Sequence, residues 1–222
     1  MKAISTLAIA LSLIALTSAK SAILITEVNP SGSGTLTYGA DWFELTNTGT
    51  SAVDVTNWRV DDSSAAFASA VTLTGITSIA AGESVIFLET SDDADLQAFR
   101  TAWFGTTSPN GLQLGKYSGS GIGLSTSSDS VVIYNASGTQ IARVNFGTAP
   151  SGATFDNSAG LNGVTISQAS TVGVNGAFTS FNGAEIGSPG NLSAVPEPSS
   201  VALAAGAAAF FALHLFRRRK TA

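Results

Sequence analysis

Residues 41–62 read DWFELTNTGTSAVDVTNWRVDD, and this stretch decides the fold. In its first part Phe43 and Leu45 alternate with Trp42 and Glu44. An alternation of period two is typical of a β-strand, because successive side chains point to opposite faces of a sheet. The short polar residues that follow include a glycine and favour a turn. We therefore expect two adjoining strands joined by that turn.

The alternation is interrupted in the second half of this stretch. Val53 and Val55 share one parity, whereas Trp58 and Val60 have the opposite one. A β-bulge near residues 56–57 would account for the change, because a bulge inserts one extra residue into a strand.

The large side chains on the best-patterned strands define the expected core. Trp42 and Trp58 bring much of the apolar area that this chain can bury. Residues 85–88 form a continuous apolar run, which is typical of a strand covered on both faces. We expect Trp42, Trp58 and Phe87 to be buried.

Further strands are expected along the chain. Residues 23–28 form the first, with Ile23, Ile25 and Glu27 on one face. Residues 129–134 and 139–146 predict a hairpin, because the polar segment between them contains a glycine. The short apolar segments at 164–166 and 178–181 predict edge strands.

One helix is expected at residues 91–105. Asp92 or Ser91 suits the N-cap, and Gly105 suits the residue after the last turn. Leu96, Phe99 and Trp103 recur at helical spacing and form an apolar stripe. The acidic residues 92–95 have a second interpretation, a calcium site, but the sequence lacks the alternating oxygen ligands and central glycine of a calcium loop.

Several of these segments together resemble a lamin-tail domain. The resemblance implies an all-β, immunoglobulin-like sandwich over residues 23–192, with the short helix as an insertion similar to that of bacterial secreted members. It rests on Ile25-Thr26-Glu27, the WFELTN run at 42–47, Val53-Asp54-Val55, Trp58 followed by Asp61-Asp62, the hairpin of residues 129–146 and a terminal turn at 186–190.

Charge and composition exclude several classes of protein. Residues 23–196 hold fourteen acidic and four basic residues, a net charge of −10. Because a nucleic-acid binder needs a basic surface, we expect no nucleic-acid partner. The chain has no cysteine, and its one histidine, His214, lies in a C-terminal apolar run. The domain therefore cannot hold a Ser-His-Asp triad, a Cys-His pair or a histidine metal site.

Carboxylates remain the available acid-base groups. Glu27 and Glu44 are expected on adjacent strands, and a suitably spaced carboxylate pair can hydrolyse glycosides. The other interpretation is that both serve the fold, because the lamin-tail resemblance implies no catalytic residues. We expect no catalytic residue, no cofactor and no metal site.

The two ends of the chain predict export. Residues 1–22 read as a secretory signal peptide, with Lys2 before an apolar run and small residues near a cleavage point. An uncleaved anchor is the alternative.

Residues 193–222 resemble a PEP-CTERM sorting signal. Pro196, Glu197 and Pro198 precede an expected transmembrane segment at 199–216, and a basic cluster follows, formed by Arg217, Arg218 and Arg219. The resemblance implies an exosortase-type processing enzyme as partner. An ordinary single-pass anchor is the alternative.

These features predict a non-enzymatic surface or extracellular-matrix module. The precursor is expected in the inner membrane with a periplasmic ectodomain, and the processed protein at the cell surface or in the matrix. Expected partners of the domain are an exopolysaccharide or a surface protein. The alternative is a carboxylate-dependent hydrolase of exopolysaccharide, and a third hypothesis is calcium-dependent adhesion through Asp61-Asp62 or residues 92–95.

Overall fold

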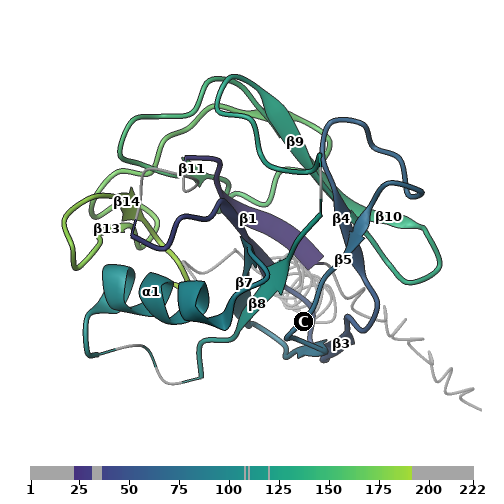
Figure 1. Ribbon diagram of the computed structural model, residues 1–222, viewed down its shortest axis with the longest axis horizontal. Helices are drawn as coiled ribbons and strands as arrows, with labels where there is room; N and C mark the ends of the chain where they lie inside the picture. Colours follow the sequence, from purple (N-terminus) through teal and green to yellow (C-terminus); the bar gives the residue numbers. More distant parts are fainter. Residues whose placement is uncertain (1–22, 32–36, 108, 110, 120, 192–222) are drawn as a thin grey trace, which may run out of the picture.

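The computed structural model describes residues 23–31, 37–107, 109, 111–119 and 121–191. These residues form a β-sandwich of two five-stranded sheets with one helix, α1 (Asp93–Phe104), against the outer face of the first sheet. Figure 1 shows α1 and the β13–β14 pair on one side of the first sheet, with β4, β9 and β10 on the other. The expected all-β sandwich with one short helix is confirmed for the described residues.

The strands pair as follows. The first sheet has the order β11 (Phe155–Asp156), β1 (Ile23–Asn29), β2 (Trp42–Asn47), β7 (Ser84–Glu89) and β8 (Leu114–Tyr117). The second has the order β12 (Thr165–Ile166), β10 (Gln140–Phe146), β9 (Asp129–Tyr134), β4 (Arg59–Asp61) and β5 (Val71–Thr72). Two short pairs lie outside them: β3 (Val53–Asp54) with β6 (Ser78–Ile79), and β13 (Phe178–Thr179) with β14 (Ile186–Gly187).

The first sheet is buried on both faces. Phe43 and Leu45 of β2 pack into the core between the two sheets, whereas Trp42 packs into a second core under α1. The Trp42 ring meets Phe99 of α1 edge to face, with 5.5 Å between ring centroids. Such edge-to-face pairs are favourable beyond the area that they bury.

The expected core is also confirmed. Trp42, Trp58 and Phe87 are 0%, 7% and 0% exposed. Phe87 contributes to the core between the sheets, and its neighbour Leu88 packs under α1. The prediction that residues 85–88 are covered on both faces is therefore correct.

The expected hairpin within residues 41–62 is wrong. β2 pairs with β1 and β7, whereas β4 pairs with β9 and β5 in the other sheet. Trp58 N–H donates to Val55 O at 3.1 Å, and Asn57 has a φ of 60°. The change of parity is therefore a turn that carries the chain from one sheet toward the other, and no bulge is needed there.

A bulge does occur in β1, where we did not expect one. The register with β2 shifts between Ile25 and Glu27. Ile23, Ile25 and Val28 consequently face the core between the sheets. Glu27 faces the α1 side, so the expectation that it shares a face with Ile23 and Ile25 is wrong.

The helix begins and ends as its sequence predicts. The Asp92 side chain accepts a hydrogen bond from Ala94 N–H at 2.9 Å, and Gly105 has a φ of 62°. Phe99 and Trp103 are buried against the first sheet. Backbone N–H groups of Phe181 and Asn182 donate to the last carbonyl groups of α1, which satisfies acceptors that a helix end leaves unpaired.

Backbone bridges join the two sheets at both sides of the sandwich. Thr74 and Lys116 pair at the β5–β8 side, and Phe155 pairs with Ala169 at the β11–β12 side. The predicted hairpin of β9 and β10 is confirmed, and β12 is the predicted edge strand at 164–166. The segment at 178–181 contributes β13, which lies outside both large sheets.

Among the described residues, no helix is both long enough and apolar enough to cross a membrane. The expected signal peptide at 1–22 and the expected transmembrane segment at 199–216 lie outside the described residues.

Candidate functional site

Glu27 and Glu44 lie directly opposite each other in the ladder between β1 and β2. The expectation that they are neighbours is therefore confirmed. Their exposed fractions are 0% and 2%, so both carboxyl groups are enclosed by protein. A buried carboxyl group needs hydrogen-bond donors, because it has lost its contacts with water.

The donors come mainly from the end of the described chain. Glu27 Oε1 accepts from Ser188 N–H at 2.8 Å and also from the Thr154 hydroxyl. Glu44 Oε2 accepts from Gly190 N–H at 2.6 Å, and its Oε1 accepts from the Thr26 hydroxyl. We call residues 184–191 the C-terminal strap, because these bonds fasten it to the first sheet.

The strap fits closely against the carboxyl pair. A Cβ atom at Gly187 would lie 2.5 Å from Glu27 Oε1 and 2.8 Å from the Trp103 ring. Side chains do not tolerate such distances, so only glycine allows β14 to approach the sheet at this point.

Burial changes the acidity of both groups. It raises the pKa of Glu27 well above its ordinary value, and the nearby Glu44 carboxylate raises it further, whereas the bonds from Thr154 and Ser188 oppose the change. Burial raises the pKa of Glu44 to about 7, against hydrogen bonds from Thr26 and Gly190. The pair therefore retains a proton near neutral pH, since two adjacent buried charges would repel each other.

This geometry favours the structural interpretation of the pair. Both side chains are enclosed, and the hydrogen-bond donors to them come from Thr26 of β1, from Thr154 and from the strap. A glycosidase needs its two carboxyl groups on either side of a bound sugar. The contacts of Glu27 and Glu44 instead hold the strap to the sheet.

The candidate calcium residues also serve local structure. Asp61 is 1% exposed and accepts bonds from the Ser64 hydroxyl and Ala66 N–H. Asp92 caps α1, and Asp93 pairs with Lys116. In the described part of the chain, no three histidine or acidic side chains are grouped so that they could hold a metal ion.

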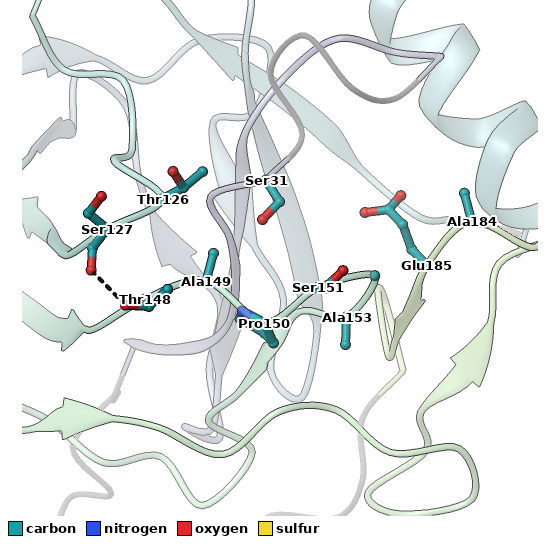
Figure 2. A pocket seen from close by; sticks show the side chains of 11 residues that line it. Ser31, Thr126, Ser127, Thr148, Ala149, Pro150, Ser151, Ala153, Ala184 and Glu185 are labelled. Atoms are coloured by element: carbon teal, nitrogen blue, oxygen red, sulfur yellow. Dashed lines mark hydrogen bonds between the residues drawn. The ribbon is translucent and has the colours of Figure 1, made fainter.

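The structure also contains a cleft that the sequence did not indicate. Its volume is ≈ 660 Å³, and Figure 2 shows its lining. The lining residues come from segments far apart in sequence and are small or hydroxyl-bearing, apart from Pro150 and Glu185. They are Ser31, Thr126, Ser127, Thr148, Ala149, Pro150, Ser151, Gly152, Ala153, Ala184 and Glu185.

The expected sorting residues cannot be placed relative to these features. Pro196, Glu197, Pro198, Arg217, Arg218 and Arg219 all lie outside the described residues. Their role stays a prediction from the sequence.

In the described part of the chain, the two sheets, the order of their strands and the one helix define a sandwich module consistent with the immunoglobulin-like class. A comparison with known protein families matches residues 17–148 to the lamin tail domain. The chain belongs to this family. A search of curated proteins found no match. The strap and the 149–153 side of the cleft lie beyond the matched residues.

Gly187→Ala should destabilise the domain by about 1–3 kcal/mol, because the added methyl group overpacks the site beside Glu27 and Trp103. Chemical denaturation measures this change. Gly147→Ala is the matched control, since no atom lies within 4 Å of the Cβ position there. Equal stability of the two variants would show that the strap does not pack against the carboxyl pair.

Glu44→Gln should change how stability depends on pH. The folded-state pKa of Glu44 is raised, so its stabilising contribution is present below its ordinary pKa of 4.5 and is lost as pH rises through about 7. Glutamine stays neutral and avoids that loss. The melting temperature of Glu44→Gln minus that of the wild type should therefore increase from about pH 5 to about pH 8.

Asp93→Asn is the control for this measurement, because the Asp93 side chain is 83% exposed. A Glu44→Gln difference that stays constant over this pH range would contradict the burial of an ionisable pair.

Proposed function

We propose that this lamin-tail protein is a non-enzymatic surface or extracellular-matrix module that is exported and then sorted through its C-terminal tail. The order of segments in the sequence carries the proposal. A signal-type segment at 1–22 precedes the acidic domain, and the Pro196-Glu197-Pro198 triplet, an apolar run and an arginine cluster follow it. This combination is similar to that of bacterial proteins with a PEP-CTERM signal.

The tail suits a temporary membrane anchor. The apolar run at 201–216 has sixteen residues, which as a helix span about 24 Å at ~1.5 Å per residue. Basic residues after a membrane segment favour the cytoplasmic side, so the domain would face the periplasm. Proline fixes φ and disfavours helix in the residue before it. The triplet would therefore stay extended outside the membrane, within reach of an exosortase-type processing enzyme.

Three observations support a structural or binding role for the exported domain. Lamin tail domains are immunoglobulin-like modules and are generally non-catalytic. The carboxyl pair that suggested a hydrolase is buried and bonded to the strap. The net charge of −10 over residues 23–196 disfavours binding to nucleic acids and to anionic lipid surfaces. An exopolysaccharide or a surface protein remains the candidate partner.

Cell fractionation with mass spectrometry of the mature termini tests the sorting step. Wild-type protein should lose its N-terminal segment and also His214 with everything after it. Glu197→Ala, and separately the triple change of Arg217, Arg218 and Arg219 to alanine, should keep His214 and stay in the membrane fraction. Ser200→Ala, which leaves both signals intact, is the matched control and should be processed.

Wild-type protein that keeps Ala222 in the inner membrane would contradict tail processing. It would leave the ordinary single-pass anchor as the interpretation of residues 193–222.

A further inference from the structure

The cleft lined by Glu185 is fixed by hydrogen bonds between its walls. Ala149 N–H donates to Thr126 O at 2.8 Å, and Ile186 N–H donates to Gly152 O at 2.9 Å. The Thr148 hydroxyl donates to Ser127 O at 3.4 Å across the same side of the cleft (Figure 2). The walls are thus joined to one another, and the hollow is preformed. Pockets of about 300–1,000 Å³ take small ligands, and ≈ 660 Å³ falls within that range.

The lining chemistry limits what can bind there. Hydroxyl groups come from Ser31, Thr126, Ser127, Thr148 and Ser151, and a hydroxyl group can both donate and accept a hydrogen bond. The remaining walls are mostly alanine, glycine and proline, which offer small apolar contacts. A ligand that carries many hydroxyl groups on a compact carbon ring matches both kinds of wall.

Glu185 adds one oriented acceptor to the cleft. Its exposed fraction is 4%, and Figure 2 shows its carboxylate directed toward the Ser31 side. Tyr38 OH donates to Glu185 Oε2 at 2.7 Å and itself accepts from Trp42 Nε1–H at 3.1 Å. Asn29 Nδ2–H donates to Glu185 Oε1. The carboxylate is therefore held in one orientation, and each oxygen has a further lone pair for a ligand hydroxyl.

Charge separates the possible ligand classes. Among the described residues, no lysine or arginine lines the cleft, so a phosphate or another anion would meet a carboxylate without a compensating cation. A cation would meet a single carboxyl group, and burial raises the pKa of that group. Its attraction for a cation is correspondingly weaker. Neutral polyhydroxylated ligands fit the lining best.

We propose that this cleft binds a neutral monosaccharide or disaccharide unit, such as one segment of an extracellular polysaccharide. The site lies where the family domain meets the residues after 148, so it combines both parts of the chain. The inference rests on the proposed binding role and names the ligand class and the residues for it.

The test uses the full chain, purified in a detergent without a sugar headgroup. Saturation-transfer NMR titrations are run with glucose, galactose, mannose, N-acetylglucosamine, cellobiose and lactose. Galacturonic acid serves as the anionic probe and cadaverine as the cationic probe. At least one neutral saccharide should bind saturably, and both charged probes should bind more weakly.

Variants place that binding in the cleft. Ser151→Leu should weaken it about tenfold or more, because leucine occupies space that the ligand needs. Ala184→Leu enlarges a lining residue on the strap and should act in the same way. Ser118→Leu is the matched control, since Ser118 is also exposed but lies outside the lining, and it should leave binding unchanged. Circular dichroism confirms that each variant is folded.

Three results would overturn the proposal. One is the absence of saturable binding by every neutral saccharide, and another is saccharide binding that survives both leucine substitutions. The third is cadaverine binding that Glu185→Gln abolishes, which would indicate a cation site. Because processing of the tail is measured separately in cells, failure of saccharide binding leaves the export proposal standing, and the reverse also holds.

Discussion

The structure depends on two buried carboxyl groups that face each other across β1 and β2. Isolated in this interior, Glu27 and Glu44 would be costly, because buried ionisable groups lose their contacts with water and repel each other when both are charged. Backbone N–H groups of Ser188 and Gly190 supply the missing contacts. The strap must therefore lie across the first sheet, and Glu185, three residues before Ser188, is held beside the cleft.

The first sheet carries an apolar core on each of its faces. Trp42 and Leu88 pack under α1, while Phe43 and Phe87 face the second sheet. The buried carboxyl groups of Glu27 and Glu44 hold the strap to the first sheet. The presence of buried acidic residues therefore says little about catalysis. The proposed binding role falls to loops at the rim of the sandwich, as is common when a rigid scaffold carries its contact residues on connections. The hydroxyl-lined cleft lies among such loops.

Sequence patterns predicted the elements better than their arrangement. Period-two alternation identified β2, a continuous apolar run identified β7, and a glycine-containing polar segment indicated the β9–β10 hairpin. Capping chemistry gave both ends of α1. These signals all act over neighbouring residues. The alternation of side chains in β4 shows which residues share a face of the strand, but not which strands lie beside it. The sequence therefore could not show that β4 belongs to the second sheet. The bulge before Glu27 has no local signature in residues 23–28. Serine and threonine are common in loops, so nothing in the sequence marked the cleft.

The most direct test of the central interaction is an NMR titration of the carboxyl carbons of Glu27 and Glu44. Both groups should titrate above the ordinary value of 4.5, with Glu44 near pH 7. The amide signals of Ser188 and Gly190 should shift with the same midpoints, because these amides donate to the two carboxyl groups. Midpoints near 4.5 for both glutamates, with no response from either amide, would contradict the buried carboxyl pair and its bonds to the strap.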